Sequence, residues 1–145
     1  MTGAVTRHCF TYGSLMWADI MARVCGREFA GEPASLADHR RHPVRGEDYP
    51  GLLVEPGGLV PGRLYRDVDA GAWARLDAFE GEQYERADVI VTRADGSALP
   101  AQVYRFRAEF ARHLLPGDWD VAAFEREGRA RFIARYAGFD LLTPR

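Results

Sequence analysis

The connections between the expected strands constrain the fold of this 145-residue chain more than any other feature of its sequence. Residues 52–55 and 59–67 are apolar stretches with strand character, and a Pro-Gly-Gly turn separates them. Residues 84–92 and 98–106 form a second such pair around the Ala-Asp-Gly turn at 94–96. Short turns of this kind join antiparallel strands, and the regular strand–helix alternation of a doubly wound sheet is missing. We therefore expect an α+β fold, with a mainly antiparallel sheet or barrel and helices packed on it.

Apolar periodicity predicts three helices along the chain. Residues 18–26 and residues 120–139 carry apolar side chains at near-helical spacing. A third helix is expected over residues 71–81, because Asp69 is a natural N-cap and Gly81 ends the pattern.

The remaining segments complete the expected order of elements. Residues 8–12 predict a buried first strand, whereas residues 28–46 have a mixed pattern that predicts no regular element. The length suits one hydrophobic core, and no repeat or long linker divides the sequence. We expect a single domain over residues 1–145.

Composition excludes several classes of function. Hydrophobic residues make up 47% and charged residues 28% of the chain, the balance of a soluble globular protein. The formal net charge of −2 provides no basic field for nucleic acid, and no stretch approaches the roughly 18 apolar residues of a membrane helix. The 19 residues counted as Lys or Arg are all arginine, which excludes a catalytic lysine. Two cysteines and an N-terminus without a signal-peptide pattern predict a cytoplasmic protein with reduced thiols.

Residues 10–17, FTYGSLMW, place a glycine turn between the first strand and an apolar, helix-like segment. Such a turn can bind a small anion, because glycine lets the backbone turn sharply and the next amides point into the gap. Ser14 follows Gly13, but the G-x-S-x-G pattern of a nucleophile elbow is missing. A serine hydrolase is therefore weakly supported, and the alternative is a turn serine whose hydroxyl caps the following helix.

Glu80 is the candidate proton-transfer residue, since it ends an amphipathic helix directly after Phe79. A carboxylate beside an apolar face can be partly buried, which raises its pKa and makes it a competent proton shuttle. A solvated glutamate at the helix end is the alternative. Glu82 and Glu85 lie close enough in the sequence to form a glycosidase-like pair with Glu80, but nothing fixes the separation of the carboxylates.

Histidine, cysteine and tyrosine residues supply further candidates. His39 and His42 lack the paired Cys/His spacing of a zinc site, so we expect surface histidines and no metal. Cys9 lies in an apolar strand, which favours an inert core thiol over a nucleophile. Tyr49 and Tyr84 are expected to reach a cleft and bind substrate, with half-buried sheet tyrosines as the alternative.

Four stretches in this order resemble one known family: FTYGSLM, DYPGLLVEPGGLVPGRLY, LDAFEGEQYERADVIV and AQVYRF. The chain is similar, over about residues 8–106, to the γ-glutamylcyclotransferase-like family, in particular its AIG2-like branch, which includes γ-glutamylamine cyclotransferases. The resemblance implies a small, mixed, mainly antiparallel β-barrel with flanking α-helices and a shallow cavity at its mouth. It also implies that the protein uses no metal or organic cofactor.

The resemblance further implies a reaction and residues that perform it. Members with activity cyclise a γ-glutamyl amine or peptide to 5-oxoproline and release the amine. The substrate's own α-amino group is the nucleophile, so neither Ser14 nor Cys9 has to be activated. The glutamyl part would bind the family's Y-G-[ST]-L loop, which corresponds here to Tyr12, Gly13, Ser14 and Leu15. The catalytic glutamate of the family corresponds to Glu80, acting as general base and then as general acid.

Two other functions stay open at this point. One is a non-catalytic small-molecule-binding or interaction domain, and the other is a transferase or lyase that acts on a different amide. Arg45, Arg63 and Arg86 are the candidate cations for a substrate carboxylate.

Overall fold

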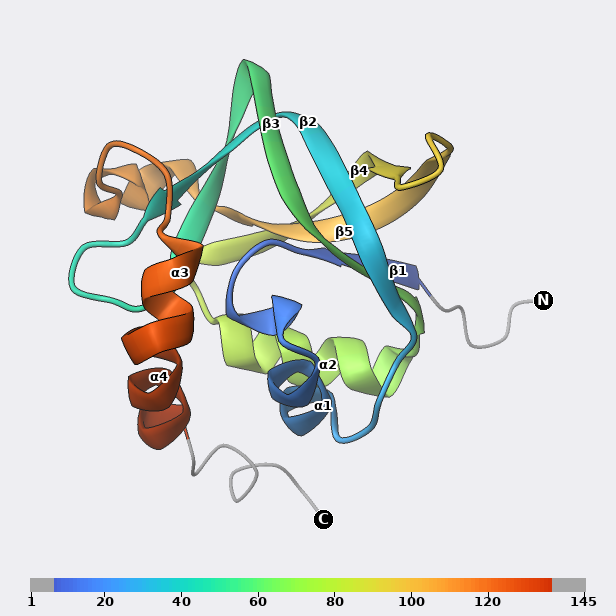
Figure 1. The fold of residues 1–145 in the computed structure, drawn as a ribbon, viewed down its shortest axis with the longest axis horizontal. Coiled ribbons are helices and arrows are strands. Elements are labelled where there is room, and N and C mark those ends of the chain that lie inside the picture. Colours follow the sequence, from blue (N-terminus) through green and yellow to red (C-terminus); the bar gives the residue numbers. More distant parts are fainter. Residues whose placement is uncertain (1–6, 137–145) are drawn as a thin grey trace.

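Five strands of the chain close into a barrel in the computed structural model, which describes residues 7–136 (Figure 1). The strands are β1 (Arg7–Thr11), β2 (Gly31–Pro43), β3 (Pro50–Val68), β4 (Tyr84–Arg93) and β5 (Ala98–Phe106). Their order around the barrel is β1-β3-β2-β4-β5, with antiparallel neighbours throughout. The barrel closes through the parallel pair of β1 and β5. The predicted α+β class and the mixed, mainly antiparallel barrel are confirmed.

The prediction for β2 and β3 is wrong in its detail. The stretch for which no element is expected contains the 13-residue strand β2, and the two strands expected around Pro-Gly-Gly form the single 19-residue strand β3. The two strands pair from Gly31 opposite Tyr65 to Pro43 opposite Pro50, so the chain reverses in the loop between these two prolines and not at Pro-Gly-Gly. Two prolines and the charged residues Asp38, Arg40 and Arg41 hide the strand character of β2, in which an exposed face alternates with a buried face.

The Pro-Gly-Gly segment bends β3 instead of reversing it. The register between β2 and β3 shifts where Asp38 lies opposite this segment, and the Asp38 carboxylate accepts a hydrogen bond from the Gly57 amide at 3.0 Å. Gly57 has a φ of 84°, which favours glycine, and a Cβ on Gly58 would lie 2.3 Å from the His39 carbonyl oxygen. This bulge lets both long strands bend sharply and curl into the barrel (Figure 1).

Helices gather beside one end of the barrel (Figure 1). The helices α1 (Ala18–Cys25) and α2 (Ala70–Glu80) match the predicted segments, and the Asp69 side chain caps α2 by accepting from the Ala72 amide at 2.9 Å. The short helices η1 (Ser14–Met16) and η2 (Ala108–His113) were not expected. Within the part of the chain described, no helix is both long and apolar enough to span a bilayer.

The predicted C-terminal helix is present but interrupted. It consists of α3 (Val121–Ala123), the π-helical turn η3 (Phe124–Gly128) and α4 (Arg129–Tyr136). Residues 137–139 of the predicted segment lie outside the described residues.

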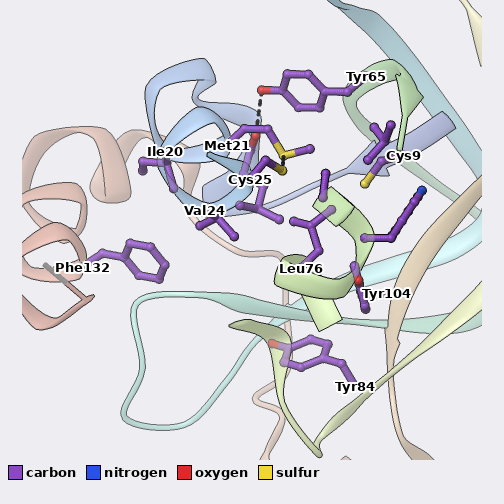
Figure 2. Packing of buried hydrophobic residues seen from close by; sticks show 14 of the residues in the cluster. Cys9, Ile20, Met21, Val24, Cys25, Tyr65, Leu76, Tyr84, Tyr104 and Phe132 are labelled. Carbon is purple, nitrogen blue, oxygen red and sulfur yellow. Dashed lines mark hydrogen bonds between the residues drawn. The ribbon is translucent and has the colours of Figure 1, made fainter. Parts of the chain in front are cut away.

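Two apolar clusters hold these layers together. One fills the barrel interior and includes Leu36, Leu52 and Leu64. The other lies between the barrel and the helices, where Met21 of α1 and Leu76 of α2 are almost completely buried (Figure 2). The hydrophobic burial that stabilises the fold therefore also fixes the helices against the barrel mouth.

Candidate active site

A cavity of about 70 Å³ opens between the barrel mouth, η1, the end of α2 and α4. It is lined by Phe10, Thr11, Tyr12, Gly13, Ser14, Leu15, Tyr49, Pro50, Phe79, Glu80, Tyr84, Tyr104 and Phe132. All seven residues predicted for the site are among them, although they come from segments far apart in the sequence. The barrel and the helices thus bring the predicted loop, the predicted carboxylate and both predicted tyrosines to one cavity.

Gly13 is required in the Tyr12–Leu15 loop for a reason that the sequence did not indicate. Its φ is −130°, outside the left-handed region, so the turn itself does not demand glycine. A Cβ on Gly13 would instead lie 2.7 Å from Cδ of Pro50, which packs directly against the loop. The expected helix cap by Ser14 is wrong, since neither η1 nor α1 begins with a side-chain cap, although Ser14 is buried at the cavity.

Side chains of β2 and β3 donate hydrogen bonds to carbonyl groups of this loop and of the residue that follows it. The buried Arg41 donates from Nη1 to the Tyr12 carbonyl oxygen at 2.8 Å. The Tyr65 hydroxyl lies 2.8 Å from the Leu15 carbonyl oxygen and 3.2 Å from that of Met16, and donates to this pair (Figure 2). The loop is therefore fixed on its protein side while its other side faces the cavity.

Sequence reasoning missed Arg41, because a run of charged residues in a segment with no expected element predicts a solvated surface. The available signal was the alternation of β2, which resumes after the bulge at Asp38 and buries both His39 and Arg41.

Glu80 is the last residue of α2, and its partly buried side chain lines the cavity beside the rings of Phe79 and Phe132. Burial raises the pKa of Glu80 from 4.5 to about 8, and the nearby Asp77 carboxylate adds to this rise. Desolvation penalises the charged carboxylate, and a neighbouring negative charge penalises it further. Asp77 in turn accepts from the Tyr104 hydroxyl at 2.6 Å. The carboxyl group can therefore hold or release a proton near neutral pH.

Glu82 and Glu85 do not join Glu80 in the cavity. Both are exposed, and Glu85 forms an ion pair with Arg107 at 3.4 Å. Among the described residues that line the cavity, Glu80 is the one carboxylate. The arrangement lacks the pair of carboxylates on which a glycosidase mechanism depends.

The tyrosines of the cavity use their hydroxyl groups to fix its walls. Tyr12 donates to the Tyr104 carbonyl oxygen at 2.6 Å, and Tyr84 donates to the Pro50 carbonyl oxygen at 2.7 Å. Burial raises the pKa of Tyr12 well above its usual range, so its phenol stays neutral. The rings of Tyr49 and Tyr84 lie with centroids 6.3 Å apart and form one side of the cavity.

The other candidates of the sequence analysis lie away from the cavity. The expectation of a surface His39 is wrong: the residue is buried, and its Nε2 accepts from Arg105 Nε at 3.1 Å. His42 contacts the Gly117 carbonyl oxygen at 3.0 Å. Across residues 7–136, no group of three or more His, Cys, Asp and Glu side chains is placed to hold a metal ion. Cys9 is completely buried, which confirms its expected core position, and burial raises its thiol pKa.

None of the three candidate arginines lines the cavity. Arg45 is exposed, and Arg63 donates to the Gly31 carbonyl oxygen at 3.2 Å. Arg86 pairs with Asp77 at 3.2 Å while its guanidinium lies over the Trp73 ring. The guanidinium groups of Arg63 and Arg86 thus hold the outside of the barrel and α2.

At the mouth of the closed mixed barrel, one carboxyl group with a raised pKa and a glycine loop line the same cavity. This arrangement is typical of an enzyme-like site for a small molecule. Residues 9–121 match the family described as "Gamma-glutamyl cyclotransferase, AIG2-like", and the chain belongs to this family. The resemblance found in the sequence is thereby confirmed.

Relatives and solved structures agree with this assignment. AIG2-like protein D of Arabidopsis thaliana is 34% identical over 143 residues, which cover 94% of this chain and 93% of that protein. A solution structure of another A. thaliana protein superposes with a TM-score of 0.72 at 23% identity, covering 94% of this chain and 84% of that one. A structure of a γ-glutamyl cyclotransferase gives a TM-score of 0.63 at 17% identity, covering 70% of this chain and 67% of that one. At these identities the structural matches show a shared fold.

Proposed function

We propose that this protein cyclises a γ-glutamyl amine or peptide to 5-oxoproline and releases the amine, with Glu80 as general base and then general acid. The observation that carries this proposal is the position of Glu80: a partly buried carboxyl group in the cavity that the Tyr12–Leu15 loop also lines. Membership of the γ-glutamyl cyclotransferase, AIG2-like family supports the same chemistry. The proposed substrate is a small molecule, in keeping with a cavity lined mostly by aromatic and other apolar side chains beside a few polar groups.

The proposed reaction moves two protons from the α-nitrogen of the substrate to the leaving nitrogen. Glu80 accepts the first proton from the α-ammonium, and the freed amine attacks the γ-carbonyl carbon. A new C–N bond closes the five-membered lactam, the bond to the leaving nitrogen breaks, and Glu80 returns its proton to that nitrogen. The second proton of the new lactam nitrogen passes to the released amine, which departs as an ammonium ion. A pKa of about 8 suits both halves, because proton transfer is most effective when the pKa of the catalyst lies near the working pH.

The loop would hold the substrate in the folded conformation that cyclisation needs. The first amides of η1 have no partner within that short helix, so they are suited to bind the substrate carboxylate or the oxyanion that develops during attack. Fixing the α-amino group close to the γ-carbonyl can supply about 7–11 kcal/mol of the barrier in favourable cases.

Release of 5-oxoproline from a panel of γ-glutamyl compounds tests the proposal. The panel contains γ-glutamyl dipeptides, ε-(γ-glutamyl)lysine, simple γ-glutamyl amines and glutathione. Wild type should convert at least one of them, and Glu80→Gln should lose about 10²- to 10⁴-fold in kcat because the amide cannot take up a proton. The matched control is Glu82→Gln, which removes an exposed carboxylate two residues away and should keep full activity.

Two outcomes would contradict the proposal. If Glu80→Gln turns over as well as wild type, Glu80 is not the proton-transfer residue. If no compound yields 5-oxoproline but calorimetry shows that one of them binds, the protein is a binding domain or acts on a different amide.

A further inference from the structure

We propose that Arg41 is a positioning residue that fixes the Tyr12–Leu15 loop and supplies the positive charge behind it for a carboxylate bound in the cavity. The inference rests on the proposed function, because it assigns how the anionic part of a γ-glutamyl substrate is held. It arises from the lining of the cavity: of the described residues that form it, none is cationic, and Glu80 is acidic. An anion in such a cavity needs compensation from a charge outside the lining.

Arg41 is placed to provide that charge. Its side chain is 5% exposed, and its guanidinium reaches the loop through the 2.8 Å bond from Nη1 to the Tyr12 carbonyl oxygen. The opposite edge of the same group binds Asp118, with Nε 2.9 Å from Oδ1 and Nη2 3.1 Å from Oδ2. The guanidinium also lies over the Trp119 ring, 5.6 Å from its centroid. Three hydrogen bonds and a ring contact therefore leave it one orientation.

The ion pair between Arg41 and Asp118 is asymmetric in its exposure to water. The Asp118 side chain is 62% exposed, compared with 5% for Arg41. Solvent screens the carboxylate far more effectively than it screens the buried guanidinium. The pair therefore presents a net positive field to the interior, where the loop lies, although its formal charges cancel.

The peptide bond between Tyr12 and Gly13 connects Arg41 to the loop that lines the cavity. The described chain contains no cis peptide bond, so the Gly13 N–H points in the direction opposite to the Tyr12 carbonyl group. The carbonyl points at Arg41, so the N–H of Gly13, which itself lines the cavity, points away from Arg41. A charged donor on the carbonyl also polarises the peptide, which makes its N–H a better donor.

A comparison of two ligands separates this role from a structural one. The first ligand is a γ-glutamyl amine that wild type cyclises, and the second is the same compound with its α-carboxylate replaced by a carboxamide. Steady-state kinetics would be measured for wild type, Arg41→Gln and Arg41→Lys, each first checked for folding by circular dichroism. The matched control is Arg40→Gln, which removes the neighbouring arginine, an exposed partner of Glu55.

The charge and the positioning should be lost in different variants. We expect Arg41→Gln to raise KM for the carboxylate ligand about tenfold, as removal of one charge at close range predicts, and to leave KM for the carboxamide unchanged. Arg41→Lys keeps the charge and should keep the preference for the carboxylate, while kcat falls because a lysine cannot hold Tyr12 and Asp118 together. Arg40→Gln should behave like wild type with both ligands.

The failures of the two proposals are distinguishable. Equal loss for carboxylate and carboxamide in Arg41→Gln, with turnover intact in wild type, would overturn the Arg41 inference and leave the proposed function standing. If wild type produces no 5-oxoproline, titration calorimetry of the same two ligands replaces kinetics. Carboxylate-selective binding that Arg41→Gln abolishes would then support the inference without the reaction, and binding without such selectivity, or no binding, would overturn both.

Discussion

Replacing Glu80 with glutamine should stabilise the protein, and the gain should grow with pH. The pKa of Glu80 is raised from 4.5 to about 8 in the folded state, so the folded protein binds this proton more tightly than the unfolded chain does. Below pH 4.5 the carboxyl group is neutral in both states. Between about 4.5 and 8 the unfolded chain releases the proton first, so wild-type stability falls as pH rises; above about 8 the full loss is reached. Glutamine resembles the neutral carboxyl group at every pH and escapes this loss.

The size of the effect follows from the same pKa. Each pKa unit corresponds to about 1.4 kcal/mol, so a change from 4.5 to about 8 corresponds to about 5 kcal/mol for a fully desolvated group. Glu80 is only partly buried, so solvent screens part of its charge. We therefore expect Glu80→Gln to exceed wild type by about 2–3 kcal/mol in free energy of unfolding at pH 9, and to equal it near pH 4.

Urea unfolding of both proteins at pH values from 4 to 9 measures this difference. The comparison at each pH cancels the other titrating groups, which the two proteins share. Glu82→Gln is the control, because it makes the same Glu-to-Gln replacement at an exposed position two residues away. A difference between Glu80→Gln and wild type that stays constant across this range would refute the reasoning, and so would an equal rise in Glu82→Gln.

Three further predictions concern the walls of the cavity and the pH profile. Gly13→Ala should lose about 1–3 kcal/mol of stability and most of its activity, because the new methyl group would lie 2.7 Å from Pro50. Urea unfolding and 5-oxoproline assays measure the two effects, and wild-type values in both would contradict the prediction. Asp77→Asn removes a negative charge that raises the pKa of Glu80. In a plot of kcat/KM against pH, the rise expected near pH 8 in wild type should therefore move to lower pH in this variant, and an unchanged profile would exclude the coupling. Phe132→Leu should raise KM and lower the free energy of unfolding by less than about 1.5 kcal/mol. Steady-state kinetics and urea titration measure these two effects separately, and an unaltered KM would show that Phe132 does not contact the substrate.

The parts of the fold that could be predicted are those in which local sequence and final environment agree. The helix at α2 is an example: Asp69 caps it, Gly81 ends it, and its apolar face packs on the barrel. Strand β2 is the opposite case. Its charged residues predict a solvated surface segment, and its strand structure depends on pairing with β3 along its whole length. Closure of the barrel by parallel pairing of β1 and β5 joins strands far apart in sequence, and no local pattern encodes it.

The candidate site divides in the same way. The Tyr12–Leu15 loop and Glu80 lie in stretches whose order along the chain resembles the family, so their residues could be named before their proximity was known. Arg41 could not be named, because its direction depends on the register shift at Asp38, which reverses the alternation of every later residue in β2. Its partner Asp118 lies 77 residues away in sequence, so the pair exists only in the folded chain.

Phe132 is the one described cavity residue that comes from beyond residue 121, where the match to the family ends. The helix that carries it packs Phe132 into the apolar cluster between the barrel and the helices, and the ion pairs from Arg129 to Asp19 and from Arg131 to Asp48 add little stability. None of the other described cavity residues comes from this helix, so the barrel, the loop and Glu80 can stay constant while this one wall is exchanged for another that fills the same apolar space. Transplanting the segment that follows residue 121 between relatives offers a route to a differently shaped cavity that leaves the proposed proton-transfer residue untouched.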